Sequence, residues 1–282
     1  MIVTSIPMMN PQIAVVTHRP YRICEDALYL PVMAGSAGMS EAETAGYIRD
    51  DTGDNISDKN DRYCELTGLY WMWKNSDADN IGLCHYRRYF AGKHRARRLD
   101  VLRPLRKNRD MFSDVVRIGE ISELMEHYQI ILPRPRRYHV ESNYLQFAHS
   151  HGSYALDETR RIIIERHPEY IDAYDRTMAG TAGHRFNMFI MRRELLNDYC
   201  RWLFDILFEL EKRITEETPD TKPDERRLYG YVAERLLDVW LDKEGCEYLE
   251  IPYVFIGKEH LVRKAAAMVM RKIRANPWIS MK

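Results

Sequence analysis

Short uninterrupted apolar runs alternate along the chain with longer stretches in which apolar residues recur every three or four positions. The first run begins at Ile13, is rich in β-branched residues and stops before the turn-forming pair Arg19 and Pro20. Runs of this kind are typical of strands that are buried on both faces of a parallel sheet. The same pattern predicts further strands over residues 29–32, 81–84, 128–133, 183–191 and 248–256.

Helical spacing of apolar residues predicts helices between these strands. The longest pattern runs from Leu195 to Ile214, and others cover residues 63–75, 118–124, 143–147, 156–165 and 228–241. Because strands and helices alternate, we expect an α/β fold: a single domain with a mostly parallel central sheet flanked by helices. The 282 residues, 45% of them hydrophobic, are enough to bury one such core.

The domain is expected to cover residues 12–257, between a leader at 1–11 and a tail at 258–282. On a helical wheel of residues 261–274, apolar side chains gather on one arc and most basic side chains on the other. A basic amphipathic helix of this kind is typical of segments that lie on an anionic membrane surface. Docking of the helix on the domain itself is the alternative.

The composition argues against several partners and locations. The 42 basic and 42 acidic side chains cancel, so no net field favours nucleic acid. Five scattered cysteines without a CxxC pair fit a reducing compartment. No apolar run approaches the roughly 20 residues of a spanning helix, and no secretory signal is recognisable. We therefore expect a cytoplasmic protein. The basic tail also allows peripheral attachment of this protein to the inner face of the plasma membrane.

A cluster of cationic and aromatic residues follows the buried run 81–84: His85, Tyr86, Arg87 and Arg88. Ligands of open α/β sheets bind outside the carboxyl ends of the strands, so these side chains are expected at the mouth of a ligand site. Guanidinium groups fit phosphate or carboxylate oxygens bidentately, which indicates an anionic ligand. The alternative is that the two arginines only pair with nearby aspartates.

A polar loop over residues 49–60 precedes the predicted helix 63–75. It contains Asp50, Asp51, Asp54 and Asn55. The composition is typical of a surface loop that caps the next helix. The alternative is a ligand loop in which a carboxylate grips a base, a ribose or a metal, because loop and strand end meet at the same edge of the sheet.

Three blocks of sequence resemble a bacterial family: residues 50–57 (DDTGDNIS), 63–75, and 85–90 (HYRRYF). This family was first catalogued as a domain of unknown function, and it occurs in gene clusters for capsule, exopolysaccharide and lipopolysaccharide O-antigen. Some members are assigned as glycosyltransferases, including galactofuranosyltransferases. The resemblance covers residues 12–257 and implies a sugar transferase with a single domain of the GT-A type.

The resemblance implies that the cluster at residues 85–88 and the loop 49–60 together bind a nucleotide sugar. Its expected residues are Thr17, His18, Asp50, Asp51, Asp54, Asn55, His85, Tyr86, Arg87 and Arg88. An acceptor site is assigned to His149, His151, His184 and Asn187. His149 and His151 have no third metal ligand nearby in sequence, so hydroxyl binding is the preferred interpretation for this pair.

An inverting transferase needs a general base near the acceptor hydroxyl. Glu234, on the predicted helix 228–241, is the candidate catalytic residue, and an ion pair with Arg235 is its structural alternative. Glu65, Asp157 and His149 are weaker candidates.

Most GT-A enzymes hold a divalent ion with an Asp-x-Asp pair at the strand end where this chain has Arg87 and Arg88. Two guanidinium groups can neutralise a leaving diphosphate in place of the ion, so no metal is expected to be required. The carboxylates of the loop 49–60 keep recruitment of Mg²⁺ or Mn²⁺ open.

The expected activity is transfer of a sugar from a nucleoside-diphosphate donor to a lipid-linked glycan in the synthesis of cell-surface polysaccharide. The resemblance favours a UDP-sugar, with UDP-galactofuranose as one example. A noncatalytic nucleotide-binding scaffold of polysaccharide assembly is the alternative. Nucleic-acid binding through the basic stretch 93–109 is a third class, which the balanced charge disfavours.

Overall fold

The computed structural model describes residues 10–93, 110–138, 140–217 and 227–256. The expected leader falls almost entirely outside these ranges, and so does nearly all of the basic stretch 93–109. The tail at 258–282, with its predicted amphipathic helix, also lies outside the described residues. Among the described helices, none combines the length and the apolar character needed to cross a membrane.

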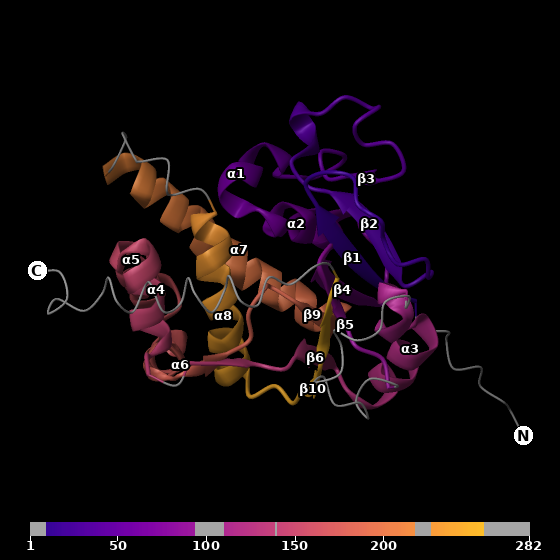
Figure 1. The fold of residues 1–282 in the computed structure, drawn as a ribbon. Coiled ribbons are helices and arrows are strands. Elements are labelled where there is room, and N and C mark those ends of the chain that lie inside the picture. Colours follow the sequence, from indigo (N-terminus) through magenta and orange to yellow (C-terminus); the bar gives the residue numbers. More distant parts are fainter. Residues whose placement is uncertain (1–9, 94–109, 139, 218–226, 257–282) are drawn as a thin grey trace, which may run out of the picture.

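A nine-stranded sheet forms the centre of the described chain, in the order β10-β6-β9-β4-β1-β2-β3, with β5 paired to β4 and β11 paired to β5 (Figure 1). β1 is parallel to β2 and β4, β2 is parallel to β3, and β6 is parallel to β10. β9 lies antiparallel between β4 and β6, so these two point the same way. The strands are β1 Pro11–Thr17, β2 Tyr29–Met33, β3 Ile48–Arg49, β4 Asn80–His85, β5 Arg88–Phe90, β6 Ile130–Pro133, β9 Phe189–Arg192, β10 Leu249–Ile251 and β11 Tyr253–Phe255.

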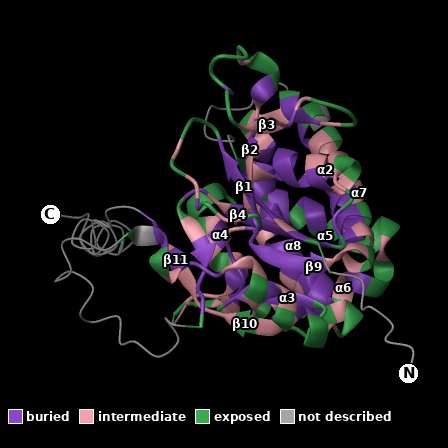
Figure 2. Ribbon diagram, turned by 90° about the vertical axis from the view of Figure 1, so that its right-hand side faces the viewer, coloured by how far each residue is buried: buried purple, intermediate pink, exposed green. Residues whose placement is uncertain are grey.

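Helices cover both faces of this sheet, which confirms the predicted α/β class (Figures 1 and 2). Along β1, Ala14 and Val16 belong to the core on one face, whereas Ile13 and Val15 belong to the core on the other. Both faces are therefore buried, which explains the uninterrupted apolar run. The helices are α1 Asn60–Tyr63, α2 Glu65–Asn75, α3 Ile118–His127, α4 Asn143–His151, α5 Tyr154–Arg166, α6 Ile171–Ala179, α7 Arg193–Glu217 and α8 Leu228–Glu244.

Four local features differ from the sequence expectation. The predicted strand 183–191 joins the central sheet only from Phe189, in β9, because Phe186 and Asn187 form a turn with positive φ angles. The predicted helix 63–75 is broken at Cys64, whose φ of 52° is outside the helical range, so α1 and α2 are separate. The predicted last strand 248–256 is two strands, because Pro252 has no N–H and the chain moves there from β6 to β5. Helix α6 and a two-stranded sheet of β7 Arg136–Arg137 and β8 Ala182–Gly183 were not predicted.

Candidate functional site

The cationic motif forms a tight hairpin at the carboxyl edge of the sheet. His85, the last residue of β4, pairs with Arg88, the first residue of β5, and Tyr86 and Arg87 form the turn between them. Because β4 is parallel to β1 and His85 lies beside Val16, the hairpin stands next to the end of β1. The structure thus places these cations at the sheet edge where α/β proteins bind ligands.

Arg88 is a half-buried cation that forms no ion pair within the described residues. Its guanidinium carbon lies 4.1 Å from the ring centroid of Phe186 and 5.8 Å from that of Phe255. Burial lowers the pKa of this guanidinium. A sequestered charge without a direct ion pair is costly, so the site favours an incoming anion.

Arg87 and Arg19 converge on the hydroxyl of Tyr21. Arg19 Nε donates a hydrogen bond to Tyr21 Oη at 2.7 Å, and Arg87 Nη2 donates one at 3.3 Å. The Tyr21 ring stacks on Tyr86 with centroids 4.0 Å apart, and His18 meets Tyr86 edge-on at 5.6 Å. We call His18, Tyr21 and Tyr86 the aromatic cluster. Stacked rings beside guanidinium groups provide a surface for a nucleobase and its phosphates.

Thr17 is set apart from this surface although it precedes His18. Its side chain is buried, and its hydroxyl donates a hydrogen bond to the carbonyl of Arg19. We therefore assign Thr17 to the shape of the turn after β1. His85 is also largely buried, and its Nδ1 has no hydrogen-bond partner among the described residues. Burial, Arg88 and Arg227 lower the pKa of His85 to about 3, so its imidazole is neutral at pH 7.

Two carboxylates lie close enough to Arg88 to affect the pKa of its guanidinium, Glu234 from α8 and Glu65 from the start of α2. Glu234 is mostly buried, with its Oε2 at 3.3 Å from Arg235 Nη1, so the ion pair considered as its alternative role does form. Burial raises the pKa of the Glu234 carboxyl; Arg235 opposes this shift, and Glu65 adds to it. Glu65 accepts a hydrogen bond of 2.9 Å from Asn187 Nδ2. The site therefore contains two adjacent acids and a cation.

Backbone strain is concentrated around these acids. Among the described residues other than glycine, positive φ angles occur at Cys64, Phe186, Asn187 and Arg227. Cys64 precedes Glu65, Phe186 contacts Arg88, and Asn187 holds Glu65. The Oδ1 atom of Asn187 is buried without a described partner. Residues held in rare conformations cluster at functional sites, so this grouping supports the location.

The acidic loop does not reach the arginines of the hairpin. Asp50 is buried and accepts hydrogen bonds from the backbone of Gly35 and Ser36 and from the hydroxyls of Ser36, Ser57 and Thr67. Its carboxylate holds the loop to α2 and has no room for a ligand role. Asp51 pairs with Arg49 at 2.6 Å, and the hydrogen bond from Arg49 lowers the pKa of Asp51. The idea that Arg87 and Arg88 pair with these aspartates is wrong.

Asp54 and Asn55 lie farther along the loop, beside the second half of α2. Tyr70 donates a hydrogen bond to Asp54 at 3.1 Å, and Lys74 lies 3.7 Å from it. Because α2 runs back toward the start of β4, this half of the helix approaches the amino edge of the sheet. The structure therefore separates Asp54 and Asn55 from the hairpin. Asn55 bonds within its own loop, to Gly53.

The histidines expected at an acceptor site take different positions. His184 is buried between Asp238, 2.6 Å from its Nδ1, and Glu250, 3.3 Å from its Nε2. Both ring nitrogens are thus occupied, so a direct role in binding hydroxyls is not supported. His149 and His151 lie in the last turn of α4, which extends beyond the predicted helical end at residue 147. His151 stacks on Tyr231 of α8 at 4.3 Å, whereas His149 is exposed and faces Glu141.

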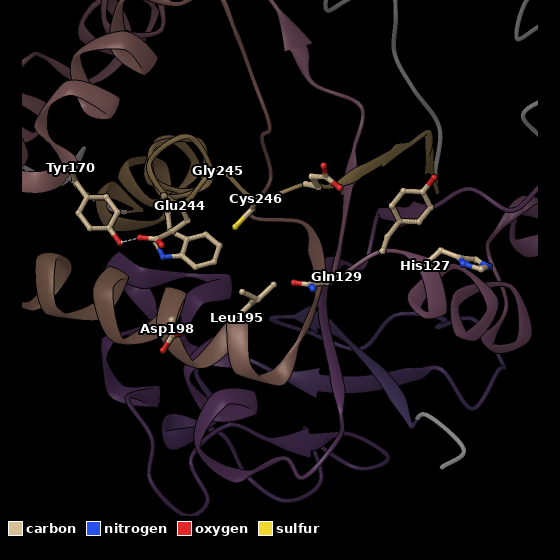
Figure 3. Close-up of a pocket in the computed structure, with 11 residues that line it drawn as sticks. His127, Gln129, Tyr170, Leu195, Asp198, Glu244, Gly245 and Cys246 are labelled. Atoms are coloured by element: carbon tan, nitrogen blue, oxygen red, sulfur yellow. Dashed lines mark hydrogen bonds between the residues drawn. The ribbon is translucent and has the colours of Figure 1, made fainter. Parts of the chain in front are cut away.

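Within the described residues, the hairpin is part of neither a cluster of metal ligands nor the lining of the two cavities given below. Among the described residues, no group of three or more histidine, cysteine or acidic side chains is placed to hold a metal ion. Two cavities of about 650 Å³ each are found elsewhere, and neither is lined by Arg87 or Arg88. Figure 3 shows the first of them. We place the candidate site by its chemistry, because a cation without a direct ion pair, two nearby acids and the strained backbone coincide at the hairpin.

Sequence reasoning missed three contributors to the site. Tyr21 and Arg19 follow β1 in a segment that the sequence marks only as a turn, and Arg227 precedes α8. Arg227 affects the pKa values of both His18 and His85, which places it near the hairpin. The pairing of β1 with β4 brings Tyr21 to Tyr86, and only the parallel-sheet topology could have suggested it.

Comparison with known proteins now adds to this geometry. Residues 12–245 match the model of a family described as a domain of unknown function, DUF4422. The apo structure of the bifunctional glycosyltransferase WbbM is similar, with 28% sequence identity, a TM-score of 0.76, and coverage of 89% of this chain and 46% of that chain. The chain therefore spans less than half of the WbbM chain. Comparison with the curated proteins gives no match. Since the family model covers most of its length, the chain belongs to the DUF4422 family, which this likeness relates to glycosyltransferases.

Proposed function

We propose that this protein is a glycosyltransferase that moves a sugar from a nucleoside-diphosphate donor to a glycan acceptor. The observation that carries the proposal is the half-buried Arg88 at the carboxyl edge of the sheet, which forms no direct ion pair among the described residues although Glu234 and Glu65 lie near it. The similarity to WbbM supports the same reaction class. In this arrangement Arg87 and Arg88 bind the diphosphate, and the aromatic cluster stacks on the base.

Glu234 is the proposed general base. A carboxylate whose pKa is raised by burial is suited to accept a proton from the acceptor hydroxyl. Glu65, held by Asn187, is the second acid at the reacting centre. The two arginines stabilise the leaving diphosphate, so we propose that transfer does not depend on a metal. Complete loss of turnover in EDTA, restored by Mg²⁺ or Mn²⁺, would refute this last point.

The proposed donor is a UDP-sugar, with UDP-galactofuranose as a named case, and the proposed acceptor is a lipid-linked glycan of a cell-surface polysaccharide. Both rest on the resemblance of the sequence motifs to the transferase family. His151 and Asn187 remain acceptor candidates by position, because they flank the polar face of α8 that carries Glu234.

The test compares Arg88→Met with Arg161→Ala, which removes an arginine exposed on α5. Binding of UDP and GDP is measured by calorimetry, and release of sugar from a panel of UDP-sugars is measured with and without a lipid-linked glycan. We expect Arg88→Met to weaken nucleotide binding at least about tenfold, as for loss of a charge-assisted hydrogen bond. We also expect its free energy of unfolding to be unchanged or about 1 kcal/mol higher, because an unpaired buried charge is removed.

Arg161→Ala should bind nucleotide like the unmodified protein. Unchanged nucleotide binding in Arg88→Met would contradict the proposed diphosphate site. Nucleotide binding without any sugar release or transfer would instead favour the noncatalytic scaffold.

A further inference from the structure

The two cavities adjoin at the amino edge of the sheet, on the side opposite the candidate site. The first lies between the end of α8 and the start of α7, and is bounded by His127, Tyr128 and Gln129 before β6 (Figure 3). The second lies between α2 and α7. Tyr170 and Asp198 line both cavities, so the two are neighbours, and we call them together the amino-edge groove. Along α8, Glu244 in this groove is about 15 Å from Glu234 at the candidate site, at 1.5 Å per residue.

The polar lining of the first cavity contains three carboxylates, from Asp198, Glu244 and Glu247. Arg201 pairs with Asp198 and Lys243 pairs with Glu244, each at 3.0 Å, so only Glu247 of the three has no ion pair among the described residues. Tyr170 donates a hydrogen bond to Glu244 and fixes its orientation. The side chains of Gln129 and Glu247 are exposed and form no hydrogen bond among the described residues. The unpaired carboxylate of Glu247 disfavours phosphates and uronic acids, and it offers acceptors to the hydroxyl groups of a neutral ligand.

Aromatic rings run along the same groove. Tyr128 is 38% exposed in the first cavity. In the second, Trp73 is partly exposed, but Phe204 stacks on it and Lys74 Nζ lies 3.8 Å from its ring centroid, so Tyr128 is the more accessible ring. Trp202 stacks on Tyr170 with centroids 4.7 Å apart, and its indole Nε1 is buried with no hydrogen-bond partner among the described residues. Flat rings bury the apolar faces of pyranose or furanose rings, while neighbouring polar groups bind the hydroxyls at their edges.

We propose that the amino-edge groove binds a neutral oligosaccharide segment, separately from the site of sugar transfer. Its choice of a neutral ligand follows from the exposed ring of Tyr128, from the side chains of Gln129 and Glu247, and from a lining whose other charges are of both signs. Its biological role, to bind the glycan that the enzyme extends, rests on the proposed function. Binding of a polymer at two places on one molecule raises the effective concentration of its end at the transfer site.

The experiment measures binding to the full chain by saturation-transfer NMR and by titration of tryptophan fluorescence. The probes are tetrasaccharides of galactose, of mannose and of N-acetylglucosamine, with tetragalacturonate as the anionic comparison. Tyr128→Ala and Glu247→Lys alter the groove. Tyr154→Ala is the matched control, because this tyrosine is 40% exposed and lines neither cavity. Arg88→Met alters only the transfer site.

We expect at least one neutral tetrasaccharide to bind, and Tyr128→Ala and Glu247→Lys each to weaken it roughly fivefold or more, as for one lost stacking or hydrogen-bond contact. Tyr154→Ala and Arg88→Met should leave this affinity unchanged, and the groove variants should leave UDP binding unchanged. The proposal is overturned if no neutral tetrasaccharide binds, if tetragalacturonate binds as tightly, or if Tyr154→Ala has the same effect as Tyr128→Ala. Glycan binding without nucleotide binding would support the groove and contradict the proposed transferase.

Discussion

Individual arginines in this protein differ in what surrounds their charge. Arg213 contacts the carboxylates of Glu158, Glu165 and Glu209, and these contacts join α5 to α7. Arg88, by contrast, is in contact with the rings of Phe186 and Phe255. A guanidinium surrounded by carboxylates stabilises structure, whereas one that is partly desolvated over aromatic rings retains its donors for an anion. This difference separates structural arginines from the proposed ligand site.

Asp50 and Asp54 belong to one motif but differ in burial, and this difference is testable. Asp50→Ala would leave the buried donors of Ser36, Ser57 and Thr67 without an acceptor, so we expect the free energy of unfolding to fall by about 3 kcal/mol or more. Asp54→Ala removes an exposed carboxylate and should change it by less than about 0.5 kcal/mol. Urea denaturation measures both. Equal effects of the two substitutions would contradict the structural role of Asp50.

Tyr21 is expected to make donor binding depend on pH. Burial tends to raise the pKa of Tyr21, but hydrogen bonds with Tyr86, Arg19 and Arg87 outweigh it and lower this pKa to about 8. Because the folded-state pKa is depressed, the stabilisation from the ionised phenol is present in full above the ordinary pKa near 10, and is lost as pH falls through 8. Above pH 8, the phenolate of Tyr21 therefore competes with a diphosphate for Arg19 and Arg87.

UDP affinity should therefore fall roughly three- to tenfold between pH 7 and pH 9 in the unmodified protein. Calorimetry at several pH values measures the change, and tyrosinate absorbance follows the ionisation itself. Tyr21→Phe serves as the control and should remove the step. A step of the same size in Tyr21→Phe would assign it to another group.

At the scale of elements, the break between α1 and α2 costs free energy, and it positions Glu65 at the candidate site. Cys64 has φ 52° and ψ −126°, a conformation that glycine adopts far more readily than other residues. It turns the chain so that Glu65 begins α2 facing Asn187. Strain of this kind costs on the order of 1–3 kcal/mol.

Cys64→Gly should therefore raise the free energy of unfolding by about 1 kcal/mol, while sugar release slows because Glu65 is held less firmly. Cys64→Ala retains a Cβ atom and should show no gain in stability, which makes it the matched control. Chemical denaturation and turnover are measured on both. A stability gain in Cys64→Ala equal to that in Cys64→Gly would show that the thiol, not the backbone, is responsible.

The elements that the sequence predicts well are those with one dominant physical signal. A strand buried on both faces gives a continuous apolar run, and a helix buried on one face gives apolar residues every three or four positions. The strand predicted from Ile13 and the helix predicted from Leu195 are therefore both confirmed. The break at Cys64, the hairpin at Tyr86 and the change of strand at Pro252 depend on tertiary contacts that no local pattern contains. The same limit applies to the site, whose acids come from α2 and α8.

At the scale of the whole molecule, the sheet separates two kinds of surface. The carboxyl edge carries the cationic hairpin, and the amino edge carries the groove, whose charged lining is of both signs. This difference in charge suits different parts of a transfer reaction, a diphosphate at one edge and a neutral glycan at the other. α8 contributes to both edges, with Glu234 at one and Glu244 at the other, so the two surfaces are held by one rigid helix.

The tail beyond residue 256 offers the last test, which concerns the whole chain on a membrane. From the sequence, we expect residues 261–274 to bind anionic lipid through Arg263, Lys264, Arg271 and Arg274. Changing these four residues to glutamine in the full chain should abolish sedimentation with vesicles that contain phosphatidylglycerol, since each basic residue contributes about 1 kcal/mol near such a surface. UDP binding should be unchanged, because the hairpin and the aromatic cluster are intact. Binding of the unmodified chain should weaken as salt rises from 50 to 500 mM, and equal sedimentation with neutral vesicles would contradict the electrostatic mechanism.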